Sequence, residues 1–422
     1  MDLIAGCKET DIGPLPRDWD LVHLGALIQY AEYGSSAASK PKGVMPVLRM
    51  GNLQEGKIDW EDLVYTSNPA EIRRYSLAPG DVLFNRTNTA ELVGKTSIYE
   101  GERPAIFAGY LIRIVPRPDR LDARYLNYIM NTELARRHSA KVLSVAVSQA
   151  NINAQKLRTY PIPLPPTVGE QRAIAAALSD VDNLLAALDR LIAKKRDLKQ
   201  AAMQQLFTGK VRLPGFRGVW SSTTIFGLAS RDKALFDDGD WIEAEYLEES
   251  GIRLVQTGNI GVGTFEEKRA RKYISARSFA DLRCKDVVVG DLLICRLAEP
   301  AGRACVMPDI GEPRMITSVD VTIFRPPIDV ADRRFLQQLF STTGWLRSVA
   351  DRCGGSTRSR ISRGELGKIE VRIPAVYEQV AIADALSDMD AELAALEQRR
   401  DKTRLLKQAM MQELLTGRTR LV

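Results

Sequence analysis

The sequence has few of the residues that build metal centres and thiol chemistry. It contains two histidines, His23 and His138, so it can form neither a His-rich metal site nor an H-E-x-x-H helix. Its five cysteines are scattered without a C-x-x-C pair, which is typical of ordinary reduced thiols in a cytoplasmic protein. We therefore expect no metal site in this chain.

Motifs for nucleotide binding and catalysis are missing as well. No G-x-G-x-x-G follows an expected strand, and no G-x-S-x-G occurs. Gly94-Lys95-Thr96 resembles the end of a P-loop, but Thr89 stands where that loop requires its first glycine. The sequence therefore predicts a chain with no catalytic residues and no cofactor of its own.

Long apolar segments are also absent. No apolar run reaches the roughly 18 residues that a membrane span needs, and the acidic N-terminal segment lacks the pattern of a signal peptide. We therefore expect a cytoplasmic protein without a membrane contact. The net charge of +6 and the isoelectric point near 9.0 form a mild basic balance, which permits nucleic-acid binding without demanding it.

The chain is a tandem repeat. Segments 170–213 and 378–421 align without a gap at an offset of 208, and 27 of their 44 positions are identical. The blocks before them repeat more faintly, for example residues 80–86 with 290–296. Two copies of one unit predict pseudo-two-fold symmetry within the chain. We place the variable blocks at 1–168 and 211–377, and the repeated helices at 169–210 and 378–422.

The variable blocks have the pattern of mixed α/β domains. Short apolar and β-branched runs predict strands at 44–50, 81–84, 111–115, 252–256, 287–295 and 319–324. Helical patterns follow at 123–137 and 331–351. The expected fold class is α+β, with two pseudo-symmetric globular α/β domains separated by two long antiparallel coiled-coil helices.

Each repeated block has the apolar pattern of one long helix. Its apolar residues recur in steps of three and four, as in the a/d seam of a coiled coil. Arg400 replaces the apolar residue at the position of Ile192. We expect the seam to resume near Leu198 and Leu206 in the first block, and near Leu406, Met410 and Leu414 in the second. The seam residues are Ile174, Leu178, Val181, Leu185, Leu188 and Ile192 in the first block, and Ile382, Leu386, Met389, Leu393 and Leu396 in the second.

A narrow seam on each helix favours pairing of the two helices, and two-fold symmetry makes that pair antiparallel. The alternative is that each helix packs on its own globular block. At 1.5 Å per residue, a helix of about 37 residues is a rod of roughly 55 Å.

Two stretches without acidic residues lie at equivalent places in the halves, at 134–158 and 352–364. Both are rich in Ser, Thr, Gly, Asn and Gln, which bond phosphates and base edges. A single such run is usually a solvated face, but its recurrence in two diverged copies favours contact with double-stranded DNA. The basic candidates are Arg136, Arg137 and Lys141 in the first stretch, and Arg358, Arg360 and Arg363 in the second.

Three motifs mark the repeated helices. Each helix starts with Glu-Gln after a proline-containing segment, at Glu170 and Glu378. Each ends in Lys-Gln-x-x-Met-Gln-x-Leu-x-Thr-Gly, at 199–209 and 407–417, and Leu-Pro-Gly-Phe-Arg-Gly-x-Trp follows at 213–220. With this order of blocks, essentially the whole chain resembles the specificity subunit of type I restriction–modification systems.

The resemblance implies a DNA-recognition subunit without catalysis. Each variable block would be a target-recognition domain that reads one half of a split DNA site. The helix pair would set the spacer between the halves and dock two methyltransferase (modification) subunits. S-adenosylmethionine, ATP and Mg would belong to those subunits and to the restriction subunits.

The family pattern also places DNA contacts in the loop before each helix, as Gly-Ser/Thr-x-Gln/Arg-x-x-Ile. The second half keeps this pattern, and the first departs from it because it lacks the glycine. The implied DNA-binding residues are Ser148, Gln149 and Asn151 in the first half, and Ser356, Thr357, Arg358 and Arg360 in the second.

Arg86 and Arg296 end matching strands in the two halves. Either arginine could contact a phosphate or a guanine. Alternatively, they could form ion pairs with Asp81 and Asp291 within their own domains.

Three other functions remain open from the sequence. The chain could be the specificity subunit of a Type IIB-like or methyltransferase-only system. It could be a coiled-coil adaptor that reads no DNA. A fused enzyme is the least favoured, because the repeat leaves no stretch of about 100 spare residues for a catalytic domain.

Overall fold

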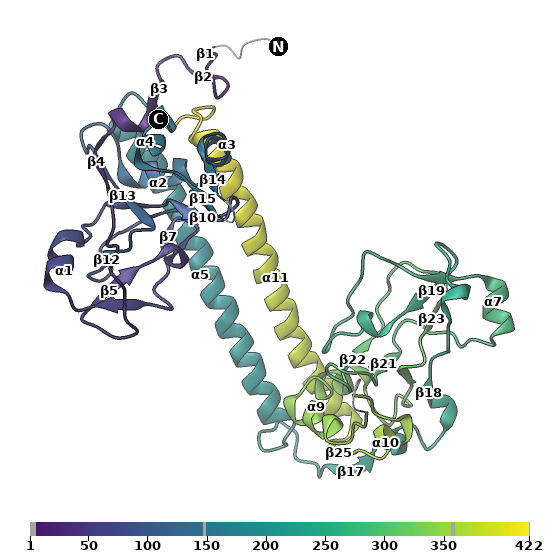
Figure 1. Ribbon diagram of the computed structural model, residues 1–422. Coiled ribbons are helices and arrows are strands. Elements are labelled where there is room, and N and C mark those ends of the chain that lie inside the picture. The colour runs from purple at the N-terminus through teal and green to yellow at the C-terminus, as the bar shows by residue number, and fades with distance from the viewer. Residues whose placement is uncertain (1–5, 147–148, 356–358, 422) are drawn as a thin grey trace. The chain divides into compact units, whose positions relative to one another are not determined.

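The computed structural model describes residues 6–146, 149–355 and 359–421, which form two compact units (Figure 1). The first unit comprises Met1–Asp189 and Gln398–Val422, and the second comprises Arg190–Glu397. Each unit therefore contains one globular domain and about half of each long helix. No helix in the described part of the chain is long and apolar enough to cross a membrane.

The domain of the first unit is built on two small sheets. Buried, mostly β-branched and apolar runs form their central strands, as their sequence predicts. The antiparallel sheet has the order β11 (Thr96–Ile98), β9 (Val82–Asn85), β13 (Leu111–Pro116) and β4 (Ile28–Tyr33). The other sheet has the order β12 (Ile106–Phe107), β5 (Met45–Leu48) and β8 (Val64–Thr66), with β12 parallel to β5.

The domain of the second unit repeats both sheets strand for strand. Its four-stranded sheet has the order β18 (Phe236–Asp238), β24 (Val321–Phe324), β21 (Leu292–Cys295) and β22 (Ala304–Val306). Its three-stranded sheet has the order β20 (Tyr273–Ile274), β19 (Ile252–Val255) and β23 (Met315–Thr317), with β19 parallel to β23. The predicted pair of pseudo-symmetric α/β domains is confirmed.

Shorter elements complete each domain. In the first unit they are α1 (Pro69–Tyr75), α4 (Ala154–Leu157), β1 (Cys7–Lys8), β2 (Leu15–Pro16), β3 (Asp20–His23), β6 (Leu53–Gln54), β7 (Lys57–Ile58) and β16 (Pro161–Leu164). In the second they are α6 (Ile225–Leu228), α7 (Ala276–Asp281), α10 (Arg363–Gly367), β17 (Ser221–Thr224) and β25 (Glu370–Ile373).

The two expected helical stretches of the domains are each broken into two helices, which corrects the prediction. The first consists of α2 (Ala123–Met130) and α3 (Glu133–Val142), and the second of α8 (Arg333–Leu339) and α9 (Thr343–Ala350). A threonine interrupts each stretch and caps the second helix: Thr132 accepts from the backbone N–H of Ala135, and Thr342 from that of Trp345. Threonine favours this position because its hydroxyl satisfies a backbone donor that has no partner within the helix.

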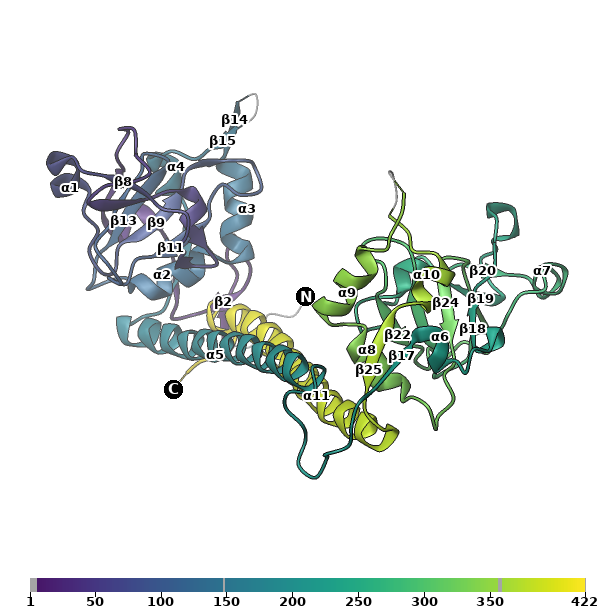
Figure 2. The ribbon, with the colours of Figure 1, turned by 90° about the horizontal axis from the view of Figure 1, so that it is seen from below.

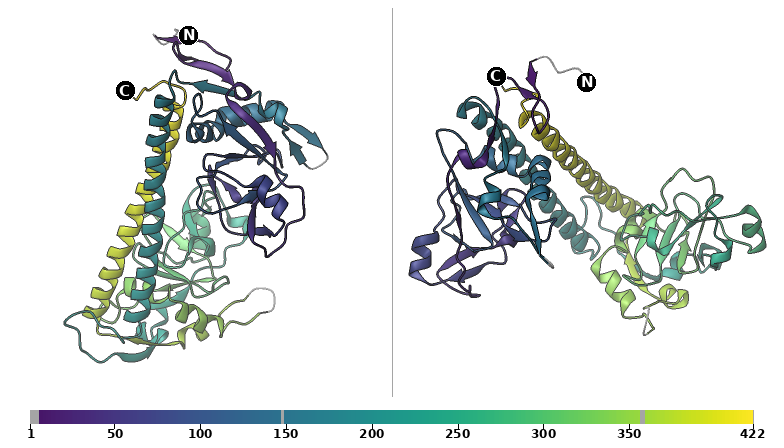
Figure 3. Two further views of the ribbon diagram at one scale, coloured as in Figure 1. Left: turned by 90° about the vertical axis from the view of Figure 1, so that its left-hand side faces the viewer. Right: turned by 45° about the horizontal axis from the view of Figure 1, so that its top comes forward.

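The two long helices are α5 (Val168–Leu206) and α11 (Val376–Leu414), with 39 residues each. In the first unit, Asp182 of α5 lies 2.6 Å from Lys407 of α11. Asp189, about two helical turns later in α5, lies 3.8 Å from Arg404, which precedes Lys407 in α11. Residue numbers that rise along one helix therefore fall along the other. Figure 3 shows these parts of α5 and α11 side by side. The predicted antiparallel pairing of the helices is confirmed.

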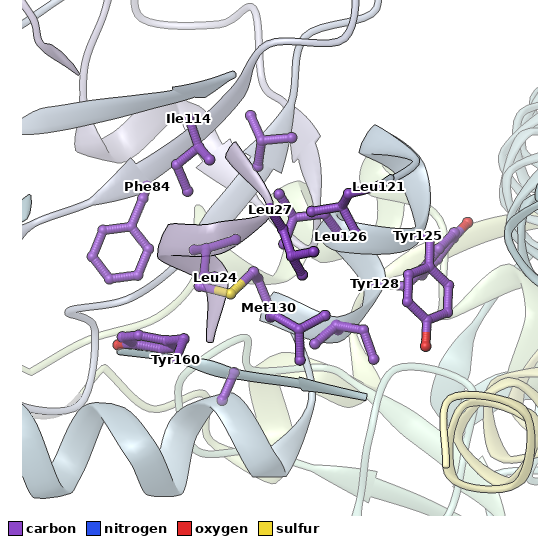
Figure 4. Packing of buried hydrophobic residues seen from close by; sticks show 14 of the residues in the cluster. Leu24, Leu27, Phe84, Ile114, Leu121, Tyr125, Leu126, Tyr128, Met130 and Tyr160 are labelled. Carbon is purple, nitrogen blue, oxygen red and sulfur yellow. The ribbon is translucent and has the colours of Figure 1, made fainter. Parts of the chain in front are cut away.

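The seam residues at the start of each helix pack on a globular domain as well as on the other helix. Ile174 and Leu178 of α5 join the main core of the first unit, together with Leu414 of α11. Figure 4 shows the aromatic and aliphatic residues of that core, among them Tyr125 and Met130. Both sequence interpretations of the seam, helix pairing and packing on the domain, are therefore correct.

The seam resumes at Leu206 and Leu414, which are buried, but not at Leu198 and Leu406. The exposed fractions are 47% for Leu198 and 55% for Leu406. Half-buried lysines lie beside these leucines instead, since Lys199 pairs with Asp390 at 2.5 Å and Lys407 pairs with Asp182. The charged pairs hold the helices together where the apolar repeat was expected to continue.

Candidate nucleic-acid interface

A hairpin projects from the body of the first unit (Figure 2). It consists of β14 (Ser144–Ala146) and β15 (Gln149–Asn151), and β10 (Thr87–Asn88) pairs with the inner side of β15. We call these three strands the arm. Asn151 donates from Nδ2 to the Thr87 hydroxyl at 2.7 Å, so its amide ties the hairpin to β10.

The arm presents part of the first acid-free stretch to solvent. Gln149 is exposed, whereas Asn151 is half-buried and partly used by Thr87. Lys156 of α4 donates to the Ser144 hydroxyl at 2.6 Å and supports the strand that begins the hairpin. Ser148, the third predicted contact of this loop, lies outside the described residues.

The helix α3 leads directly into the arm and carries three predicted basic contacts. Arg136 and Arg137 are each 75% exposed and pair with Glu133 at 4.0 and 3.4 Å, respectively. Exposed pairs of this kind contribute little to stability and are readily exchanged for another anion. Lys141 is also exposed. These three cations are therefore available for a phosphate backbone.

At the base of the arm, Arg86 occupies a site that the sequence reasoning only partly anticipated. Its guanidinium carbon lies 4.7 Å from the ring centroid of Tyr33, and Nη1 donates to the backbone oxygen of Gly109 at 3.3 Å. Its pairing with Asp81 was an alternative, but Asp81 lies against Arg113 instead, at 3.5 Å. Among the described residues, Arg86 has no carboxylate partner.

The equivalent arginine of the second unit is buried in an ion pair. Arg296 is 3% exposed, lies 3.0 Å from Asp238 and donates to the backbone oxygen of Ile361 at 3.1 Å. Burial lowers the pKa of the Arg296 guanidinium, against the opposing effect of Asp238. The internal ion-pair interpretation is the one that these contacts support, although the partner is Asp238 and not the expected Asp291.

Two predicted contacts in the second acid-free stretch are also paired within their domain. Arg360 lies 2.8 Å from Asp320, and Arg363 forms an ion pair with Asp237. Burial acts to raise the pKa of Asp237, but the bonds from Lys285 and the charge of Arg363 hold it below its ordinary value. The remaining predicted contacts here, Ser356, Thr357 and Arg358, lie outside the described residues.

A buried glutamine joins each globular domain to its long helix, and the sequence reasoning gave it no role. Gln171 accepts from the backbone N–H of Asp122 at 2.8 Å and donates to the backbone oxygen of Arg120 at 3.0 Å. Gln379 likewise accepts from the backbone N–H of Asp332 at 2.9 Å. Because these are the glutamines of the Glu-Gln motif at the two helix starts, the motif itself was the signal.

A second joint links the domain to both helices. In the first unit, the Tyr128 hydroxyl donates to Asp182 at 2.7 Å, and Asp182 also pairs with Lys407. Burial raises the pKa of Tyr128, so the hydroxyl stays a donor. In the second unit Gln338 takes the place of the tyrosine and donates to Asp390 at 2.9 Å.

The seam residues differ in burial along each helix. Leu188 and Ile192 are buried, while Val181 and Leu185 are half-buried. In the second copy, Ile382 and Leu386 are buried, and Met389, Leu393 and Leu396 are half-buried.

Comparison with known proteins gives one consistent answer. The family model for the type I restriction modification DNA specificity domain matches residues 16–195 and 259–405. The chain is 24% identical to the MjaX specificity subunit of Methanocaldococcus jannaschii, named as part of a type I restriction enzyme, over 98% of this chain and 96% of that protein. It is 28% identical to the MjaVIII specificity subunit of the same organism over 49% of each chain, so it spans about half of that relative.

Solved structures share the fold. The S subunit of the type I restriction-modification system from M. genitalium has a TM-score of 0.59 at 13% identity and matches over 98% of both chains. A chain from a study of assembly and conformational transition in a type I R-M system has a TM-score of 0.59 at 17% identity, over 96% of this chain and 99% of that one.

Proposed function

The chain belongs to the family of type I restriction modification DNA specificity proteins, and from this premise we propose how its parts divide the work of DNA recognition. The chain is the DNA specificity subunit of a type I restriction–modification system. Each globular domain reads one half of a bipartite site through its arm or the equivalent loop. The observation that carries this proposal is a sheet topology repeated strand for strand, with different side chains against the arginines that follow the equivalent strands β9 and β21.

The chemistry of the two faces supports two different half-sites. In the first unit the candidate contacts are Arg86, Arg136, Arg137, Lys141, Ser148, Gln149 and Asn151. In the second they are Arg296, Ser356, Thr357, Arg358, Arg360 and Arg363. Amides and arginines read adenine and guanine edges, and exposed cations hold phosphates. Of this set, Arg296 has the weakest support, because its guanidinium is buried and already paired.

The helix pair sets the spacer and docks two modification subunits. Each helix of 39 residues is about 58 Å long at 1.5 Å per residue, which exceeds one turn of DNA, about 34–36 Å. The exposed leucines Leu198, Leu405 and Leu406 give the pair apolar surface that a subunit could cover.

The chain supplies recognition and leaves the chemistry to its partners. S-adenosylmethionine, ATP and Mg belong to the modification and restriction subunits, and the complex works on DNA in the cytoplasm. A Type IIB-like or methyltransferase-only system would use the same two domains in the same way. An adaptor that reads no DNA has less support, because α3 presents the exposed cations Arg136, Arg137 and Lys141 next to the arm of the first unit.

Methylation mapping tests the proposal. The chain is co-expressed with the modification subunit encoded beside it in a methylation-free host, and the DNA is sequenced for N6-methyladenine. We expect a split motif with two different half-sites and a fixed gap. A complex that co-purifies but methylates no defined motif would contradict the recognition role and favour the adaptor.

A further inference from the structure

Arg86 and Arg296 hold the same place in the two domains. Each follows the end of an equivalent central strand of its four-stranded sheet, β9 or β21. The backbone oxygen of Arg86 accepts from Ile152 N at 2.9 Å, and that of Arg296 accepts from Ile361 N at 3.0 Å. The two arginines therefore sit at the same hydrogen bond between the sheet and the segment that precedes the long helix.

The neighbours of these arginines have changed from aromatic to acidic. Sheet register places Tyr33 and Asp238 at equivalent positions, because each aligns, across one intervening strand, with the residue two positions before the arginine. The backbone N–H of each arginine donates to a loop residue, which is Tyr110 in the first unit and Asp320 in the second, at 3.1 and 2.8 Å. The residues at these two positions are thus both tyrosines in one unit and both aspartates in the other, and the Tyr33 ring and the Asp238 carboxylate are the groups that contact the guanidinium.

This exchange changes what the arginine can do. Asp238 neutralises Arg296 inside the domain. Tyr33 instead supports the flat face of the Arg86 guanidinium and leaves its charge unpaired among the described residues. Nη1 is fixed by Gly109, while Nη2 has no hydrogen-bond partner in the described part of the chain. A guanidinium stacked on an aromatic ring keeps its N–H edge free for a planar acceptor.

The aromatic neighbours are themselves exposed. Tyr33 is 40% exposed and Tyr110 is 54% exposed. The Tyr33 hydroxyl is fixed by the backbone N–H of Ala154, which donates to it at 2.9 Å, so the ring cannot swing away from Arg86 without losing that bond. The first unit therefore holds an oriented cation against the exposed ring of Tyr33 at the base of the arm.

We propose that Arg86 contacts a guanine in the half-site read by the first unit, and that Tyr33 is the positioning residue that holds it there. Arginine bonds the O6 and N7 acceptors of guanine through two parallel N–H groups, which needs a fixed orientation. The equivalent position of the second unit does not offer such a contact, because Arg296 is paired with Asp238. The inference rests on the proposed DNA recognition and assigns Arg86 to one base pair of the half-site.

Methylation profiling of variants tests this assignment. The full chain with its modification subunit is expressed with Arg86→Lys, Arg86→Ala, Tyr33→Leu or Tyr33→Phe. The arginine variants should lose the preference for one G·C pair in one half-site, with a discrimination about 10-fold to 100-fold weaker. Tyr33→Leu should weaken the same base pair, and Tyr33→Phe, which keeps the ring, should retain most of the preference. A structural role for Tyr33 alone would not select one base pair.

Two controls keep the outcomes distinct. Arg73→Ala removes an exposed arginine from α1 of the same unit and should leave the profile unchanged. Arg86→Lys keeps the charge but not the two parallel N–H groups, so a profile kept by Arg86→Lys and weakened evenly at all positions by Arg86→Ala would indicate a phosphate contact and overturn the base assignment. An unchanged profile for Arg86→Ala would overturn it as well. If the wild-type complex methylates no split motif, the proposed function itself fails, whatever the variants do.

Discussion

The two units keep the same joints and differ in the faces that the joints position. Gln171 and Gln379 bind the start of an equivalent domain helix with nearly the same geometry. At the end of β9 and β21, by contrast, Arg86 stacks on a tyrosine and Arg296 is buried against an aspartate. After duplication, the contacts that fix a domain on the helix pair were retained while the surface available to a ligand diverged.

This difference separates two kinds of substitution. A change in a joint should disturb the stability of its own unit and affect both half-sites through geometry. A change on one face should alter one half-site and leave the fold intact. Substitutions of both kinds test that distinction.

The largest effect is expected from the joints. Gln171→Ala and Gln379→Ala each remove a fully buried amide and leave a backbone N–H, that of Asp122 or Asp332, without its partner. Each change should destabilise its unit by about 2–4 kcal/mol, because the lost hydrogen bonds and the cavity add. Urea denaturation of the full chain measures the loss.

Exposed glutamines on the same helices provide matched controls. Gln200→Ala on α5 and Gln412→Ala on α11 make the same chemical change in solvent. These variants should stay within about 0.5 kcal/mol of wild type. If the buried and exposed substitutions had equal effects, the joints would not be what holds the domains to the helices.

The next largest effect comes from making the first face resemble the second. Tyr33→Asp places a carboxylate beside Arg86, as Asp238 lies beside Arg296. The new ion pair should neutralise the cation and weaken binding of a duplex carrying the first half-site by about 10-fold. Competition binding with duplexes altered in one half-site at a time measures it.

A second substitution in the same unit serves as the control for Tyr33→Asp. Glu61→Ala removes an exposed carboxylate of the same unit, at a distance in sequence from Tyr33 and the arm, and should leave affinity for the duplex near wild type. A Tyr33→Asp variant with unchanged affinity would mean that Arg86 takes no part in DNA binding. Equal losses for both half-sites would contradict the separation of the two faces.

The repeated helices and the domain pair could be predicted because their signals are local or periodic. The heptad steps at Ile174 and Leu178 and the glycine at Gly209, which adopts a positive φ of 66°, mark the seam and the end of α5. The same periodicity failed at Leu198, because cross-helix charges of Lys199 and Asp390 replace apolar contact there. A heptad pattern is defined by apolar residues alone, so it carries no information on ion pairs between residues far apart in sequence.

The recognition face was only partly predictable for the same reason. Arg86 was visible because it ends a strand that recurs in the repeat, whereas Tyr33 meets it from another strand through sheet register. Asp238 was likewise missed as the partner of Arg296, and Asp291 was chosen because it lies near in sequence. Proximity across a sheet depends on strand order, which the sequence did not provide.

A smaller effect is expected from the charge pairs that join the helices. A double-mutant cycle with Asp182→Ala and Lys407→Ala should give a coupling of about 1 kcal/mol, since both side chains are at most 20% exposed. The same cycle on Lys195 and Glu392, whose side chains are 30% and 49% exposed, should give less than about 0.5 kcal/mol. Equal coupling in the two cycles would show that burial of the pair does not set its strength.

The smallest expected effect concerns the pH dependence of stability, in which the two units should differ. Burial lowers the pKa of His138 in α3, and the charges of Lys141 and His23 lower it further, whereas α9 has Ser348 at the matching position. Because the unfolded chain binds this proton first, the contribution of His138 to stability is present above about pH 6.5 and is lost as the pH falls through the lower folded pKa. Melting of the wild type should therefore shift down by a few degrees between about pH 7.5 and about pH 5.5, and His138→Gln should reduce that shift. A shift of the same size in the variant would assign the acid sensitivity to other groups, and the two domains would then not differ in this respect.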